Sequence, residues 1–188
     1  MQNPSGGFAS YEKIRGSTYL ELLNPAEVFD RIMVEYSYPE CTTAVLTSLS
    51  LFHSHYPSYR SFEILTAIRK AAEFIRKSQR ADGSWYGSWA ICFTYATFFA
   101  VQSLEMVGEQ FGNSERVRGA CNFLLSKQMA DGGWGEHWSS CEEKRYVQHE
   151  KSQVVNTCWA VLALMHAGYP DLIPIQKGLE VRNCHPPG

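Results

Sequence analysis

The sequence predicts an all-α protein whose helices form two layers. Apolar residues recur at helical spacing over most of the 188 residues, and segments with the alternating pattern of β-strands are scarce. Amphipathic segments also alternate along the chain with segments that are apolar nearly all round. An amphipathic helix buries one face, whereas a helix that is apolar all round must be covered on every side. The alternation therefore indicates inner helices covered by outer ones.

Two helices are expected in the N-terminal third of the chain. Residues 24–36 begin with Asn24 as a helix cap and Pro25 at the first helical position, and apolar residues follow at helical spacing. Residues 40–56 form a second segment with this periodicity, and Pro57 closes it.

The following helices differ in pattern. Residues 62–79 place apolar side chains on one stripe and basic side chains opposite, which is typical of a surface helix, and residues 114–128 are similar. Residues 90–108 and 152–168 are apolar or aromatic nearly all round. We expect these last two helices to be buried on every side.

A seven-residue phrase occurs three times, as QNPSGGF, QRADGSW and QMADGGW. A single copy would be explained by a buried aromatic ring at the end of a helix, but three copies indicate an internal repeat. We expect the glycine to permit a left-handed turn and the aromatic ring to pack beneath it. The glutamine amide can satisfy backbone groups left unpaired at helix ends. The repeat residues are Gln2, Gly6, Phe8, Gln79, Gly83, Trp85, Gln128, Gly132 and Trp134.

The composition and the spacing of charged and metal-binding residues indicate which ligands this protein is not expected to bind. The chain has 17 Lys and Arg against 19 Asp and Glu, without a basic run, so nucleic acid is not expected as a partner. Six scattered cysteines without a CxxC pair read as reduced intracellular thiols, and the histidines form no HxxxH or HExxH pair. We predict no metal and no cofactor. Binding to a membrane surface stays open.

Longer phrases resemble a known family. QNPSGGFASYE, LLNPAEVFDRIMVEYSYPECT, DGSWYGSWAICFTY and LLSKQMADGGWGEHWSSCEE, together with the glutamine-tryptophan repeat, are similar to the triterpene cyclases, and among them to the oxidosqualene cyclases that form lanosterol. The resemblance runs from residue 2 to about residue 176. It implies an incomplete α/α barrel, with residues 1–188 as a piece of the catalytic C-terminal domain and residues from about 177 to 188 as an atypical tail.

The resemblance also implies a reaction. Members of this family cyclise (3S)-2,3-oxidosqualene through an acid-triggered cascade of carbocations, which needs one strong acid, aromatic faces and a dry cavity. The DCTAE motif that carries the family's acid does not occur here, so we expect the isolated chain to be inactive. Ala96 and Ala100 stand where the family usually has glycine, which puts product fidelity in question.

Four site residues follow from the resemblance. Tyr11, Phe29 and Trp89 match aromatic residues that face the substrate, and Cys41 matches a cysteine that hydrogen-bonds the catalytic acid. From the residues alone, the aromatic side chains read as ordinary core and Cys41 as an inert buried thiol. Glu40 is a possible acid by its chemistry, although the resemblance assigns it no such role.

The resemblance places the parent protein on the endoplasmic reticulum membrane or a lipid droplet as a peripheral or monotopic protein, through regions outside this chain, with oxidosqualene as its ligand. Two other interpretations remain. One is a different α/α-barrel terpenoid enzyme, such as a protein prenyltransferase β subunit or a prokaryotic-type squalene cyclase. A prenyltransferase should show Asp, Cys and His zinc ligands, which the sequence does not make apparent. The other is a non-catalytic fragment that binds a lipid or a protein partner.

Overall fold

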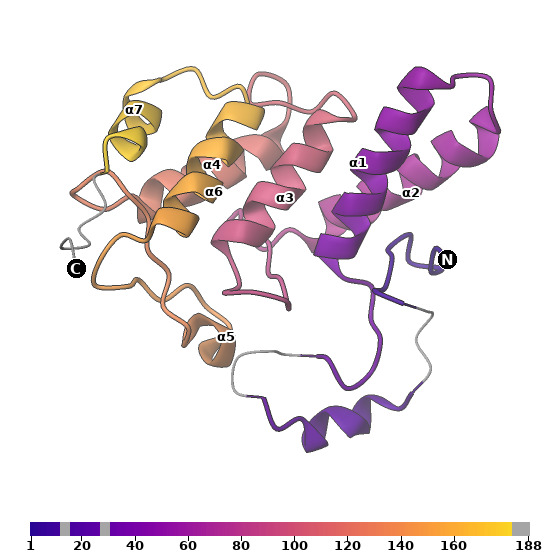
Figure 1. The fold of residues 1–188 in the computed structure, drawn as a ribbon, viewed down its shortest axis with the longest axis horizontal. Helices are drawn as coiled ribbons and strands as arrows, with labels where there is room; N and C mark the ends of the chain where they lie inside the picture. Colours follow the sequence, from indigo (N-terminus) through magenta and orange to yellow (C-terminus); the bar gives the residue numbers. More distant parts are fainter. Residues whose placement is uncertain (12–15, 27–30, 182–188) are drawn as a thin grey trace, which may run out of the picture.

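The computed structural model describes residues 1–11, 16–26 and 31–181. This part of the chain is helical, and its β-pairing is limited to isolated bridges. Figure 1 shows the arrangement of the helices. The elements in chain order are η1 (Thr18–Leu23), α1 (Pro39–His55), α2 (Ser61–Ser78), α3 (Thr94–Glu105), α4 (Glu115–Lys127), α5 (Ser140–Glu143), α6 (Val154–His166) and α7 (Ile173–Leu179).

The helices form the two layers that the sequence predicts. Helices α1, α3 and α6 make an inner row, in which α3 contacts both of the others. Helices α2, α4 and α7 are the outer partners that follow them in the chain, and α2 and α4 lie behind the inner row in Figure 1. The described residues thus form three pairs, each with an inner and an outer helix.

The amphipathic pattern of residues 62–79 is confirmed in α2. One stripe of this helix is buried against its neighbours, and the basic side chains at its end remain accessible. The buried stripe consists of Ile64, Ile68, Ala71, Ala72 and Ile75.

The helix predicted for residues 24–36 is wrong in its described part. Asn24 accepts a hydrogen bond from the Ala26 N–H at 3.0 Å, a bond that a helix cap and an Asx turn share, but residues 31–36 are not helical. Further along, Arg31 has a φ of +57°. Glu21 then accepts bonds from the backbone N–H groups of Met33 and Val34, at 3.1 and 3.0 Å. A side chain of η1 thus binds amides that a helix would have paired internally.

The complete burial predicted for residues 152–168 is also wrong. Helix α6 buries one face against α3 and α7, but Val155 is 57% exposed and Met165 is 57% exposed. The expectation holds better for α3, where most side chains are buried. Ala96 and Ala100 are among them, both fully buried.

The glycine of each repeat adopts the predicted left-handed conformation. Its φ is +91° at Gly6, +90° at Gly83 and +90° at Gly132. A Cβ added to Gly83 would lie 2.3 Å from the backbone oxygen of Gly119 in α4. Glycine is therefore required for the turn and for its close approach to an outer helix.

The glutamine of each repeat joins its own turn to the outer helix of the following pair. Nε2 of Gln79 donates to the Gly83 carbonyl at 2.9 Å and to the Arg116 carbonyl at 2.8 Å. Arg116 is the second residue of α4, so its carbonyl is not one that a helix end leaves unpaired. That part of the prediction was wrong. The other glutamines bond in the same way, Gln2 to Gly6 and Ala67, and Gln128 to Gly132 and Pro174.

The tryptophan indole makes the helix-end bond that we expected from glutamine. Nε1 of Trp85 donates to the Ile75 carbonyl, and Nε1 of Trp134 donates to the Leu124 carbonyl, both at 2.7 Å. Each carbonyl is among the last four of its outer helix, which have no partner within the helix. The backbone N–H of each repeat aromatic also donates to a threonine of the following inner helix; the pairs are Phe8–Thr42, Trp85–Thr97 and Trp134–Thr157.

Candidate functional site

Cys41 lies in the first turn of α1 and is half-buried. Its Sγ is 3.5 Å from the Ser10 Oγ. Burial raises the pKa of the Cys41 thiol, and the hydrogen bond with Ser10 opposes that shift. The thiol therefore stays protonated near neutral pH, and a protonated thiol can donate a hydrogen bond to a carboxylate.

Trp89 lies in the segment between the second repeat turn and α3, and 43% of it is exposed. Its ring meets the ring of Tyr38 edge-on, with centroids 5.6 Å apart and an interplanar angle of 64°. Tyr38 is the residue that precedes α1, and it is buried. The Trp89 ring is thus supported by the start of α1 and remains partly open.

Glu40 connects the start of α1 with the segment that carries Trp89. Its Oε1 accepts hydrogen bonds from the Ser88 N–H at 2.6 Å, the Trp89 N–H at 3.1 Å and the Tyr95 hydroxyl at 2.5 Å. Burial, followed by the charge of Glu40, raises the pKa of Tyr95, so the tyrosine stays protonated and donates. Because Cys41 is next to Glu40 in α1, these contacts bring Cys41 and Trp89 to the same end of the inner layer.

The other two predicted site residues are less informative. Tyr11 is 87% exposed, although the preceding Ser10 contacts Cys41 and donates its N–H to the Glu35 Oε2 at 3.0 Å. Phe29 lies outside the described residues.

Tyr95 is buried, and its ring links the Trp89 segment to α6. Its ring lies 5.6 Å from that of Trp159 and 6.1 Å from that of Phe99, measured between centroids. Sequence reasoning missed Tyr38 and Tyr95, and it considered Glu40 only as an acid. The sequence offered one signal for Tyr95, which is an aromatic residue in a predicted inner helix six residues after Trp89. It offered none for the hydrogen bond between Tyr95 and Glu40, because these residues are 55 positions apart. Electron-rich ring faces beside a protonated thiol suit the stabilisation of cations.

A second carboxylate, Glu136, has a structural position. It is fully buried, and it accepts bonds from the Phe93 N–H at 2.9 Å, the Thr94 N–H at 2.9 Å and the Thr94 hydroxyl at 2.8 Å. Burial raises the pKa of Glu136 to about 7, while these hydrogen bonds act in the opposite direction. Glu136 thus caps the start of α3.

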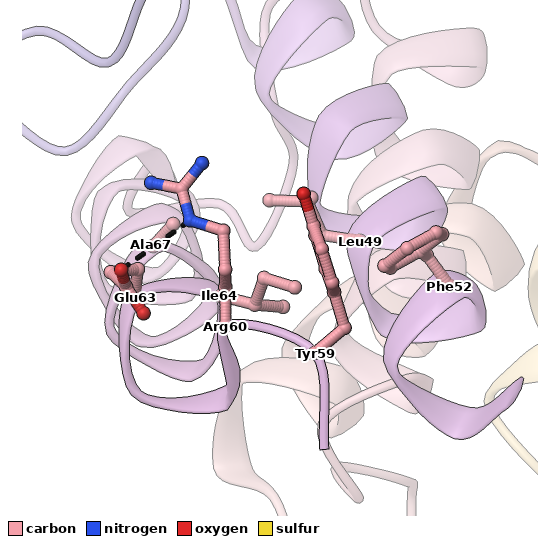
Figure 2. A pocket seen from close by; sticks show the side chains of 7 residues that line it. All are labelled: Leu49, Phe52, Tyr59, Arg60, Glu63, Ile64 and Ala67. Atoms are coloured by element: carbon pink, nitrogen blue, oxygen red, sulfur yellow. Dashed lines mark hydrogen bonds and ion pairs between the residues drawn. The ribbon is translucent and has the colours of Figure 1, made fainter. Parts of the chain in front are cut away.

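Surface hollows among the described residues lie away from this end of the inner layer. One of about 390 Å³ opens between α1 and α2, and Figure 2 shows Tyr59, Phe52 and Leu49 on one side of it and Arg60 and Glu63 on the other. Leu49 is about 12 Å along the α1 axis from Cys41, so this hollow is not at the end that carries Cys41 and Trp89. A further hollow, of about 380 Å³, is an apolar groove between α6 and α7.

Within residues 1–11, 16–26 and 31–181, no three His, Cys, Asp or Glu side chains are grouped as a metal site. No helix in this part of the chain is long and apolar enough to cross a bilayer.

Two layers of paired helices, joined by repeated glutamine-glycine-aromatic turns, define a domain of the α/α-barrel class. The family model for the squalene-hopene cyclase C-terminal domain matches residues 1–184, and the chain belongs to this family.

Several lanosterol synthases are similar to this chain over most of its length. Lanosterol synthase erg7B of Aspergillus fumigatus is 61% identical over 181 residues, which is 96% of this chain and 25% of the relative. Lanosterol synthase ERG7 of Saccharomyces cerevisiae is 55% identical over 176 residues, 94% of this chain and 24% of the relative. Lanosterol synthase of Homo sapiens is 50% identical over 183 residues, which is 96% of this chain and 25% of the relative. The chain thus spans about a quarter of the length of these relatives.

Proposed function

We propose that this chain is part of an oxidosqualene cyclase and that the complete protein converts (3S)-2,3-oxidosqualene to lanosterol. The observation that carries the proposal is the partly open Trp89 ring, held against Tyr38 at the end of the inner layer where the Cys41 thiol lies. Relatives named lanosterol synthase, 50–61% identical, support the same reaction.

In this reaction Trp89, Tyr11 and Phe29 present ring faces to transient carbocations. A cation within about 6 Å of a ring centroid gains roughly 2 kcal/mol or more when it is desolvated. Cys41 donates a hydrogen bond to the catalytic acid and so influences its acidity. The acid comes from a part of the protein outside this chain, so the chain alone is inactive.

We also infer the setting of the domain. Residues 1–188 belong to the catalytic α/α-barrel domain, and residues from about 177 to 188 are an atypical tail. The complete protein collects its insoluble substrate as a peripheral or monotopic protein of the endoplasmic reticulum membrane or a lipid droplet, through regions outside this chain.

The test is to express the complete protein in yeast that lacks its own lanosterol synthase and to identify the triterpenes by mass spectrometry. We expect lanosterol from the complete protein and no cyclised product from the 188-residue chain alone. Absence of any cyclised product from the complete, folded protein would contradict the proposed reaction. Product from the isolated chain would contradict its inactivity.

A matched pair of variants tests the site. Trp89 and Trp138 are each 43% exposed, and each lies four residues after the tryptophan of a repeat. We expect Trp89→Phe to increase the share of incompletely cyclised products, because phenylalanine has the weaker cation-binding face. Trp138→Phe should leave the product ratio unchanged. Equal ratios in both variants would remove Trp89 from the cation-binding surface.

A further inference from the structure

Glu40 is a carboxylate whose bonds converge on one short segment. Its Oε1 binds the backbone N–H groups of Ser88 and Trp89, at 2.6 and 3.1 Å. The Tyr95 hydroxyl lies 2.5 Å from the same oxygen. A fixed acceptor for two successive amides determines the path of the backbone at Trp89, and with it the direction in which the side chain leaves the backbone.

Tyr95 makes this attachment stronger by serving as both donor and acceptor. Its hydroxyl oxygen accepts from the Trp89 N–H at 3.0 Å and from the Ala90 N–H at 3.1 Å. With these amides acting as donors, the hydroxyl proton is free to point to Glu40. Carboxylate, hydroxyl and backbone amides thus form one network around Trp89.

Gly87 shows how closely the segment approaches this network. A Cβ at that position would lie 2.1 Å from the Tyr95 hydroxyl oxygen and 2.8 Å from the Glu40 Oε1. Only a residue without a side chain allows the backbone to pass over these two groups.

The ring of Trp89 is held from the same helix start as its backbone. Tyr38 contacts the ring edge-on at 5.6 Å, and Tyr38 is two residues before Glu40. The Tyr38 hydroxyl donates to the Arg31 carbonyl at 2.8 Å, which fixes that ring in turn. The start of α1 therefore holds both the backbone and the side chain of the tryptophan.

We propose that Glu40 is a positioning residue that sets the orientation of the Trp89 ring and thereby determines how completely the substrate is cyclised. This inference rests on the proposed function, because it assigns Trp89 to a carbocation. Glu40 acts through its acceptor oxygen and transfers no proton. Attraction between a cation and a ring depends on the position of the cation over the ring face, so a displaced ring stabilises the wrong intermediate.

The test compares Glu40→Leu, Glu40→Gln and Tyr95→Phe in the complete protein. Leucine removes the acceptor, and we expect the ratio of incomplete to complete cyclisation products to rise roughly fivefold, in the same direction as in Trp89→Phe. Glutamine keeps an oxygen for the three donors, so its ratio should stay near that of the wild type. Tyr95→Phe, which preserves the packed ring, should shift the ratio less than leucine does.

Glu136→Leu is the matched control, because Glu136 also binds two backbone amides and a hydroxyl but is fully buried at the start of α3. It should lower the amount of all products without changing their ratio. Labelling with 5-fluorotryptophan gives a second readout that does not require activity. The Trp89 resonance, assigned with Trp89→Phe, should move in Glu40→Leu and Tyr95→Phe and stay in place in Glu136→Leu.

Two results would overturn the inference. One is an unchanged product ratio and an unchanged Trp89 resonance in folded Glu40→Leu, or in Tyr95→Phe if the leucine variant does not fold. The other is loss of all turnover in folded Glu40→Gln, which would make Glu40 an acid. Failure of the proposed function would give a different result. The wild-type protein would then form no tetracyclic product, while the Trp89 resonance would still move in Glu40→Leu.

Discussion

Replacing Gly83 with alanine should destabilise the chain more than the same change at Gly108. Both glycines have left-handed backbones, with φ of +90° and +83°. A Cβ at Gly83 would lie 2.3 Å from the Gly119 oxygen and 2.6 Å from its carbonyl carbon, whereas a Cβ at Gly108 would meet nothing within 4 Å. The two variants therefore share the backbone strain and differ in the clash.

The magnitudes follow from these two contributions. A left-handed alanine costs about 1–2 kcal/mol, and both variants lose this amount. Forcing a methyl group into a closely packed contact costs a further 1–3 kcal/mol or so, because the turn must move away from α4. We expect a loss of about 2–5 kcal/mol for Gly83→Ala and about 1–2 kcal/mol for Gly108→Ala.

Thermal unfolding measures the difference. One kcal/mol corresponds to about 2–4 °C in a protein of this size, so Gly83→Ala should melt several degrees below Gly108→Ala. The Gln79 bond to Arg116 should weaken with it, since both contacts join the same turn to α4. Equal melting temperatures for the two variants would refute the argument that the close approach to Gly119, rather than the turn itself, requires glycine.

Two further changes test buried polar groups by urea unfolding. Trp134→Phe leaves the Leu124 carbonyl without its indole donor and should lower the free energy of unfolding by about 2–4 kcal/mol. Trp138 is 43% exposed, so Trp138→Phe should change it by no more than about 0.5 kcal/mol. Equal losses in the two variants would contradict this role of the indole. Burial raises the pKa of Glu136 from 4.5 to about 7, so the folded state binds more protons than the unfolded state between these pH values. The free energy of unfolding should therefore fall by about 3 kcal/mol as pH rises from 4.5 to 7, and then level off. The difference in unfolding free energy between wild type and Glu136→Gln should follow that course, and a difference that is constant with pH would rule it out.

The sequence predicts those parts of the fold that depend on residues close together in the chain. The left-handed turn at Gly83 and the burial of Trp85 follow from a seven-residue phrase, and the stripe of α2 follows from its periodicity. Residues 24–36 show the limit of such reasoning. Asn24 and Pro25 suit a helix start and a turn equally well, and the outcome depends on Glu21, whose carboxylate binds amides up to 13 residues away.

The candidate site could be predicted only in part, for the same physical reason. Cys41 and Trp89 could be proposed as site residues because each lies in a recognisable phrase. Their proximity depends on Glu40 and Tyr95, which are 55 residues apart and meet only when α1 packs beside α3. Spacing along the sequence contains no signal for a contact that the packing of two inner helices creates.

Successive repeats differ at one position close to the proposed site. Aligned on their glutamines, QRADGSWYGSW and QMADGGWGEHW place Gly87 opposite Glu136. In the third repeat, the carboxylate belongs to the segment itself and caps the start of α3. In the second repeat this position is a glycine, and the Tyr95 hydroxyl and the Glu40 carboxylate from α1 lie 2.1 and 2.8 Å from where a Cβ would be. A carboxylate supplied by another helix ties the orientation of the Trp89 segment to the packing of α1 against α3. The same repeat thus supplies a carboxylate cap in one copy and receives a carboxylate from another helix in the other.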